Sequence, residues 1–395
     1  TFKGATAATT VGTDTWGGRS VAGNTTAGNI VTVGGGTHTN VYGGWTTGTG
    51  STATDKGDSI SNNVTVSGSA TVSGTVYGGY TNVTGGRASN NTVNLGSVTL
   101  NQVVGGEGTT TDNNTVNINS TNVTGTITGG TADGTGNTLN VAGTNTAANI
   151  VGFQKVHFDA MGAVKNSTLL TITGADATKV DWTKLTATGT AVKPLTLLKN
   201  DRGIELAGYT GAAKSETTDT AETNVDVRKN NAGKVTAITY EGYQFAGVTT
   251  PVIIGTDAYG GISKAGNATH TNHITVNGDY ANVYGGHTSG AGTTRDDRDN
   301  SYSNTVTIAG GTVTGKLYGG YTAAADGKTY SNTVNINGGN LSNAEISGGN
   351  RTIGTEKGNT LNVNTEAMVK KIDNFQTVAF KDAASKLTLT DTGTF

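Results

Sequence analysis

The stretch "VYGGYTNVTGG", residues 76–86, has three relatives in the chain, and this repetition decides the fold. The related stretches are "VYGGWTTGTG" at 41–50, "VYGGHTSG" at 283–290 and "LYGGYTAA" at 317–324. Copies of one motif separated by a few tens of residues are typical of repeat proteins, in which each repeat buries its apolar face against the next. We therefore expect a stack of repeats rather than a set of independent globular domains.

Each repeat also contains an asparagine followed by alternating apolar residues, as in Asn91-Thr92-Val93-Asn94-Leu95. Further copies begin at Asn114, Asn137, Asn272, Asn304, Asn332 and Asn359, with Asn63 as a variant displaced by one residue. Alternation with a period of two predicts strands with one buried face. Three short strands per repeat, joined by Gly-rich corners, predict an all-β fold in which each repeat is one coil of a parallel β-solenoid.

The length of the repeats varies at one corner only, directly after the glycine pair. From the asparagine to the apolar residue before Gly-Gly the distance is 11 to 14 residues, whereas from there to the next asparagine it ranges from 10 to 22. Loops of different length can project from a stack without disturbing its strands only at an edge. These loops shorten along the chain twice, which predicts a duplication: a first solenoid segment at 1–185, a β-rich connecting subdomain at 186–250 and a second segment at 251–395.

Composition excludes several classes of function. The net charge of −2 and the absence of a Lys/Arg cluster argue against nucleic acid as a partner. With no cysteine, thiol catalysis, Cys-ligated zinc and disulfides are excluded. No apolar run is long enough to span a membrane, and the N-terminal "TFKGATAATT" is not a signal peptide. We expect neither a cofactor nor membrane insertion by this region.

The repeated motif supplies the candidate site. Alternation places Val76 inward and Tyr77 outward, and Gly78-Gly79 is expected to form a corner with positive φ. Outward tyrosines on neighbouring coils would stack about 4.8 Å apart. The candidate ligand-binding residues are Tyr42, Tyr77, Tyr284 and Tyr318 before the glycines, and Trp45, Tyr80, His287 and Tyr321 after them. Such an aromatic strip beside projecting loops suits a glycan or protein surface, or it only seals a corner of the rod.

Other polar residues have simpler interpretations. The repeated asparagines are expected to hydrogen-bond to their copies in the coils above and below. Asp296, Asp297 and Asp299 lie on the longest loop of the second half, where interleaved arginines and the lack of an EF-hand pattern favour a solvated, partner-facing loop over a metal site. The five histidines are scattered and no nucleophile motif is present, so we expect no enzyme.

The Thr-, Asn- and Gly-rich repeats, such as "SNNVTVSGSATVSGTVYGGYTNVTGG" at 61–86 and "NTVNINGGNLSNAEISGGN" at 332–350, resemble the passenger region of bacterial autotransporter (type V secretion) adhesins. This resemblance implies a right-handed parallel β-helix displayed on the Gram-negative cell surface, or secreted, with a membrane anchor elsewhere in the protein. It also implies a host cell-surface protein or glycan as the partner. No family catalytic residues carry over, and the Gly-Asp-Ser-Gly motif of protease-bearing passengers is absent.

Three other functions stay open from the sequence. A structural or self-associating surface spacer would use the same rod, with exposed strand edges pairing between copies. A polysaccharide-active β-helix enzyme would assemble carboxylates from different coils, which the linear sequence does not show. An ice-binding solenoid would need Thr-x-Thr in register on every coil, and "TVT" is found only in some repeats, at 305–307 and 312–314.

Overall fold

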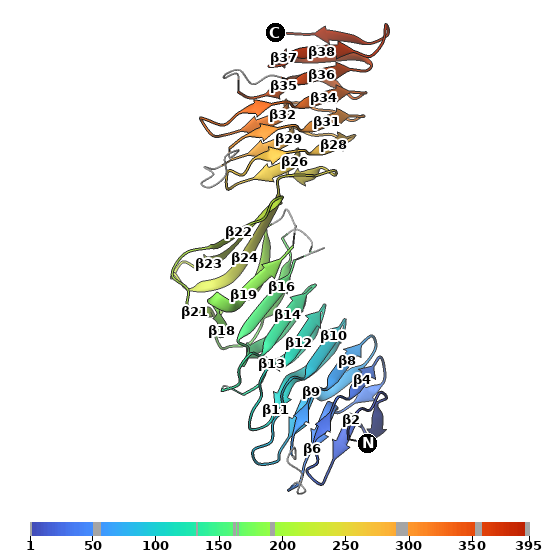
Figure 1. The fold of residues 1–395 in the computed structure, drawn as a ribbon, viewed down its shortest axis with the longest axis vertical. Coiled ribbons are helices and arrows are strands. Elements are labelled where there is room, and N and C mark those ends of the chain that lie inside the picture. Colours follow the sequence, from blue (N-terminus) through green and yellow to red (C-terminus); the bar gives the residue numbers. More distant parts are fainter. Residues whose placement is uncertain are drawn as a thin grey trace. The chain divides into compact units, whose positions relative to one another are not determined.

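A computed structural model gives the fold of residues 2–49, 57–131, 133–160, 163, 166–189, 194–289, 299–351 and 358–391. The described residues form 39 strands and a single 3-10 turn at Trp182–Lys184, so the protein is all-β. The chain divides into two compact units, one made of Thr1–Lys214 with Val225–Glu241 and the other of Ser215–Asn224 with Gly242–Phe395. In each unit taken by itself, strands from successive repeats lie side by side as parallel arrows (Figure 1).

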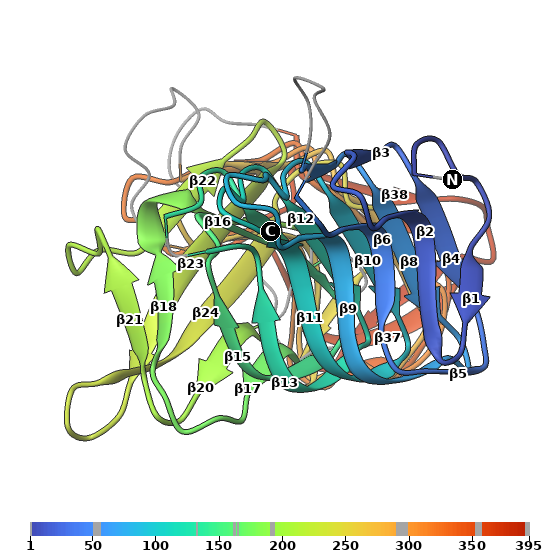
Figure 2. The ribbon, with the colours of Figure 1, turned by 90° about the horizontal axis from the view of Figure 1, so that it is seen from below.

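Two long sheets make up most of the first unit. The asparagine-led strands pair in parallel and in register, in the order β4 (Ile30–Val33), β8 (Asn63–Ser67), β10 (Thr92–Gly96), β12 (Thr115–Asn119), β14 (Thr138–Ala142), β16 (Lys155–Asp159) and β19 (Leu185–Thr188). The strands that carry the glycine pair lie in the second sheet, here called the glycine-pair sheet, together with later strands that lack the pair. It contains β2 (Asp14–Ser20), β6 (Val41–Thr46), β9 (Thr71–Thr81), β11 (Thr99–Glu107), β13 (Asn122–Thr128), β15 (Asn145–Val151), β17 (Thr168–Ile172) and β20 (Leu195–Asn200). Figure 2 shows β9, β11 and β13 as neighbours in this sheet.

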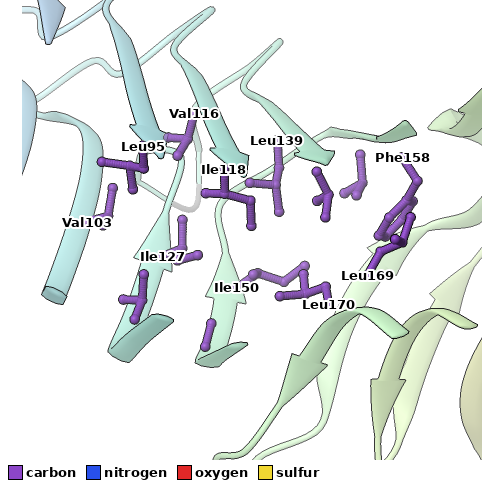
Figure 3. Packing of buried hydrophobic residues seen from close by; sticks show 14 of the residues in the cluster. Leu95, Val103, Val116, Ile118, Ile127, Leu139, Ile150, Phe158, Leu169 and Leu170 are labelled. Atoms are coloured by element: carbon purple, nitrogen blue, oxygen red, sulfur yellow. The ribbon is translucent and has the colours of Figure 1, made fainter. Parts of the chain in front are cut away.

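The core lies between the two sheets. Inward residues of the asparagine-led strands, such as Leu95 and Ile118, point toward Val103, Ile127 and Ile150 of the other sheet (Figure 3). Each of these five side chains is at most 3% exposed, as expected for the apolar positions in the repeat. Because the same positions recur in successive repeats, one continuous apolar cluster is buried along the unit.

The second unit repeats this arrangement. Its glycine-pair sheet contains β26 (Asp257–Ser263), β29 (Val283–Thr288), β32 (Lys316–Thr322), β35 (Leu341–Gly349), β37 (Glu366–Asp373) and β39 (Lys386–Leu389). Its asparagine-led sheet contains β28 (His273–Val276), β31 (Thr305–Ile308), β34 (Thr333–Ile336), β36 (Thr360–Val363) and β38 (Thr377–Phe380). Between them, β27 (Thr269–His270), β30 (Ser301–Tyr302) and β33 (Thr329–Tyr330) form a short third sheet.

Within residues 186–250 the glycine-pair sheet of the first unit continues, and the chain then turns back. Strand β20 pairs in parallel with β17, and β24 (Val235–Gln244) pairs antiparallel with β20. Beyond β24 the sheet continues with β23 (Ala221–Lys229) and β22 (Lys214–Thr217). Strand β21 (Ile204–Ala207) pairs separately with β18 (Thr178–Asp181). The segment is shared between the two compact units, and the duplication with a separate connecting subdomain stays a prediction.

A ladder of buried asparagines runs along each unit, as the sequence predicts. The Nδ2 group of Asn91 donates to Asn114 Oδ1 at 3.1 Å, and that of Asn304 donates to Asn332 Oδ1 at 3.0 Å. The member of the ladder preceding Asn91 is Asn62 and not Asn63, which is exposed. In the first unit the ladder is Asn29, Asn62, Asn91, Asn114, Asn137 and Gln154, and in the second it is Asn272, Asn304, Asn332, Asn359 and Gln376.

Candidate functional site

The repeated motif places one aromatic residue before the glycine pair and one after it, within a single extended strand. Val76 is fully buried and Tyr77 faces outward, as alternation predicts. The expected positive φ is wrong, because Gly78 and Gly79 both lie within β9 and outside the left-handed region. Space explains the glycines instead: a Cβ on Gly78 would lie 2.4 Å from the carbonyl oxygen of Gly105 and 2.9 Å from Cβ of Asn91. The asparagine ladder therefore packs directly beneath the motif.

In the first unit the outward aromatics form two rows. Trp16, Tyr42 and Tyr77 stack along neighbouring strands, with ring centroids 6.3 and 4.9 Å apart and interplanar angles of 11° and 1°. Trp45 and Tyr80 form the second row and meet the first edge-on, as in the 5.4 Å contact between Tyr77 and Tyr80 at 72°. Edge contacts of this kind stabilise aromatic pairs beyond the area that they bury.

The second unit carries the same two rows. Tyr259, Tyr284 and Tyr318 stack with centroids 4.9 and 5.7 Å apart. His287 and Tyr321 stack at 4.7 Å with an interplanar angle of 13°. The rows meet at right angles where Tyr284 contacts His287 at 5.0 Å and 89°. The eight aromatic residues singled out from the sequence thus form two clusters of four, one in each unit.

Two members of the stacks were not anticipated. Trp16 and Tyr259 begin the first row of each unit, in the related stretches "VGTDTWGG" at 11–18 and "IGTDAYGG" at 254–261. In each case an antiparallel hairpin opens the sheet, formed by β1 (Thr9–Val11) with β2 and by β25 (Val252–Ile254) with β26. A search for Gly-Gly preceded by any aromatic residue would have found both.

Charged side chains border the aromatic rows of the first unit. The Arg19 guanidinium lies 4.8 Å from the ring centroid of Trp16 and 4.9 Å from that of Trp45, within the range of cation–π attraction. Glu107 lies opposite Tyr80 on the next strand. Burial raises the pKa of the Glu107 carboxyl, so the proton is held more tightly there than in water.

The aromatic rows are half-buried and carry no charge near neutral pH. Burial raises the pKa of the tyrosine hydroxyls in both units, which keeps Tyr42, Tyr77, Tyr284 and Tyr318 as neutral phenols. Burial lowers the pKa of His287, which favours the neutral imidazole. Tyr42 is only 9% exposed, whereas the other members of the two predicted clusters keep more of their surface in contact with solvent.

A second set of rings in the second unit lies outside the predicted rows. His270, Tyr302 and Tyr330 stack on β27, β30 and β33 with centroids 5.2 and 5.0 Å apart. Their motifs, "THTN", "SYSN" and "TYSN", share a ring one position after a small hydroxyl residue. This stack has no counterpart among the rows named from the sequence.

The acidic loop is only partly described. Asp296 and Asp297 lie outside the described residues, whereas Asp299 adopts a φ of 63° and donates its backbone N–H to the Gly266 carbonyl at 2.8 Å. In the described part of the chain, no three His, Asp or Glu side chains come together as a metal site. Among the same residues, no helix has the length and the apolar character needed to cross a membrane.

Comparison with known proteins identifies no relative. Neither a protein-family model, nor a curated protein, nor a solved structure matches the chain.

Proposed function

We propose that the chain is an interaction module of a bacterial cell surface, in which a rigid stack of repeats presents two clusters of aromatic residues to a host-cell protein or glycan. The fold that fits this function is a right-handed parallel β-helix, duplicated along the chain. Parallel, in-register pairing of each strand with its equivalent in the next repeat supports the solenoid, as does the asparagine ladder.

One observation carries the functional proposal: both units build the same pair of aromatic rows on the outside of the glycine-pair sheet, and every ring in them except those of Trp16 and Tyr42 is partly exposed. Rings are costly to leave in water, and a large apolar patch at a surface marks an interaction site more often than chance exposure does. A ring needed only for packing would be expected to lie deeper, as Phe158 does at 0% exposure.

The test is binding of the purified chain to epithelial cells and to a panel of host glycans. Replacing Trp45 and Tyr80 by alanine in the first unit, or His287 and Tyr321 in the second, should reduce binding at least tenfold. A matched control replaces Tyr330, which belongs to the separate ring stack of the second unit, and should leave binding unchanged. Equal binding by all variants, with the fold intact, would show that the aromatic rows do not bind the partner.

Self-association is a second candidate, favoured by one exposed ring of the second unit. Among the described strands β38 has a neighbour on one side only, and Phe380 of this strand is 51% exposed. Its register equivalent in the first unit, Phe158 on β16, is fully buried because β19 covers that edge. Sedimentation velocity over a hundredfold range of concentration would reveal pairing of such edges between copies.

A polysaccharide-active enzyme is less well supported. Glu345 and Asp373 line one hollow of the second unit, as a pair of catalytic carboxylates would. However, Lys316 and Lys370 donate to the Glu345 carboxylate and lower its pKa to about 2. A general acid in glycoside hydrolysis needs a raised pKa, so Glu345 is not suited to that role.

A further inference from the structure

The outward row of tyrosines ends differently in the two units. In the first unit the position after Tyr77 is occupied by Val104, followed on the next strand by Thr128. In the second unit the position after Tyr318 is occupied by Ser347, followed by Asp373. The Val104 side chain fills the position next to the Tyr77 ring, whereas the Ser347 side chain is too short to fill the position next to Tyr318.

A hollow of about 150 Å³ lies at this place, lined by Tyr318, Ser347, Asp373, Lys316, Glu345 and Lys371 among others. One face of the Tyr318 ring stacks on Tyr284, so the opposite face is the one toward the strand of Ser347. Asp373 is two strands away from Tyr318 in the sheet, at roughly twice the 4.8 Å spacing of neighbouring strands. The gap between the ring and the carboxylate is therefore one ring thick.

Charged groups border this gap on one side. Lys316, Glu345 and Lys371 occupy successive strands in register, beside the row of Tyr318, Ser347 and Asp373. Lys316 pairs with Glu345, and the ammonium of Lys371 lies 3.5 Å from the Asp373 carboxylate. The side chains of Lys316, Lys371 and Asp373 remain 49%, 32% and 45% exposed, so their donors and acceptors are accessible from solvent.

We propose that this hollow, here named the Ser347 slot and defined by the residues that line it, binds one pyranose ring of a glycan. The apolar face of the sugar would lie against the free face of Tyr318, and its hydroxyl groups would donate to Asp373 and accept from Lys316 and Lys371. An apolar platform with a few fixed polar groups is the usual composition of a small-ligand site, and hydrogen bonds to charged partners are the strong ones. The inference rests on the proposed function and names the ligand class for the second unit.

The first unit shows why the slot is specific to the second. At the equivalent strand pair, Gln102 and Thr75 take the places of Glu345 and Lys316, and Val104 takes the place of Ser347. The platform of stacked tyrosines is present, but the gap and the charged groups at the positions of Lys316 and Glu345 are not. We therefore expect the sugar to bind to the second unit alone.

Saturation-transfer NMR on the full chain tests this, with methyl β-glucopyranoside and methyl β-glucuronide as probes. The wild type should transfer saturation to the ring protons of one or both sugars. Ser347→Tyr should abolish the transfer, because a further ring at this position extends the stack into the slot, as Tyr77 does above Tyr42 at 4.9 Å. Val104→Tyr makes the same change at the equivalent position of the first unit and should leave transfer unchanged.

Two further variants keep the test decisive if Ser347→Tyr disturbs the fold. Asp373→Asn preserves shape and should weaken sugar binding at least fivefold, and Tyr318→Leu removes the platform and should abolish it. No transfer from either sugar to the wild type, or equal transfer in the Ser347→Tyr variant, would overturn the assignment.

The cell-binding assay separates this proposal from the proposed function. Cell binding that depends on the aromatic rows, without transfer to either sugar, would refute the slot and leave the interaction module standing. Sugar binding that depends on Ser347, without cell or host-glycan binding, would support the slot and refute the interaction module.

Discussion

Replacing Asn304 by alanine should destabilise the second unit far more than replacing an asparagine on its outer face. Asn304 is fully buried, and its Oδ1 accepts from the backbone N–H of Asn272 at 3.3 Å and from the Nδ2 of Asn272 at 2.7 Å. Its own Nδ2 donates to the Thr269 carbonyl at 3.1 Å and to Asn332 at 3.0 Å. Asn272 Nδ2 keeps its bond to the Phe245 carbonyl, so the backbone N–H of Asn272 is the group that loses its partner.

The expected magnitude follows from this count of partners. A buried donor left without an acceptor costs about 1–3 kcal/mol, and each further hydrogen bond that is lost costs about 0.5–1.5 kcal/mol. With one donor left unpaired and three further hydrogen bonds lost, the free energy of unfolding should fall by about 2.5–7.5 kcal/mol in Asn304→Ala. Asn335 is the matched control: it lies on the outside of β34, donates to Thr307 at 3.1 Å and is only half-buried, so Asn335→Ala should cost about 1 kcal/mol.

Guanidinium denaturation, monitored by circular dichroism, measures both variants. If the two units unfold in separate transitions, only that of the second unit should move. A loss below 1 kcal/mol in Asn304→Ala, or equal losses in the two variants, would refute the view that the buried ladder stabilises the stack.

Three other substitutions test separate features. Gly78→Ala should lower the free energy of unfolding by about 3 kcal/mol, since its Cβ would meet the Gly105 carbonyl. The Cβ of Gly85→Ala meets nothing within 4 Å, so this variant should lose only about 1 kcal/mol, for its positive φ. Thermal unfolding compares the two variants. Glu222→Ala should destabilise the second unit by about 2–4 kcal/mol, because Ser263 Oγ and Asn267 Nδ2 each donate to its carboxylate at 2.7 Å; Glu216→Ala, at an exposed position, should change little. Burial lowers the pKa of His287, so as the pH falls below about 6.5 the unfolded state takes up the proton before the folded state does. The free energy of unfolding should therefore decrease between pH 7.5 and 5. Unfolding curves measured over this range should show a smaller decrease for His287→Phe.

The sequence predicts the structure of the repeats wherever buried and exposed residues alternate along a strand. The inward valines, the asparagine ladder and the stacking of Tyr42 on Tyr77 all follow from one residue pattern applied to every coil. The sequence pattern did not include Trp16 and Tyr259, because the residue before each ring is Thr15 or Ala258 and not a large apolar residue. Thr15 and Ala258 are nevertheless buried.

Two other features depend on distances that the sequence does not contain. A glycine pair indicates either a left-handed turn or a lack of space, and only the position of Asn91 beneath Gly78 distinguishes the two. The Ser347 slot requires the lateral register of three strands, and an irregularity between Leu341 and Glu345 shifts that register. The spacing of residues along the chain predicts neither.

The asparagine ladder gives each stack a direction. In both units the backbone N–H of every ladder asparagine donates to the side-chain oxygen of the next ladder residue toward the C-terminus, and a glutamine, Gln154 or Gln376, accepts the last bond. A whole repeat can be inserted or deleted without leaving one of these groups unmatched, because each repeat contributes one backbone donor and one side-chain acceptor. Two stacks can be joined without interrupting the asparagine ladder only if the C-terminal end of one ladder meets the N-terminal end of the other. Such a stack can lengthen by copying complete repeats in one orientation, and its length then changes in whole steps of one strand spacing.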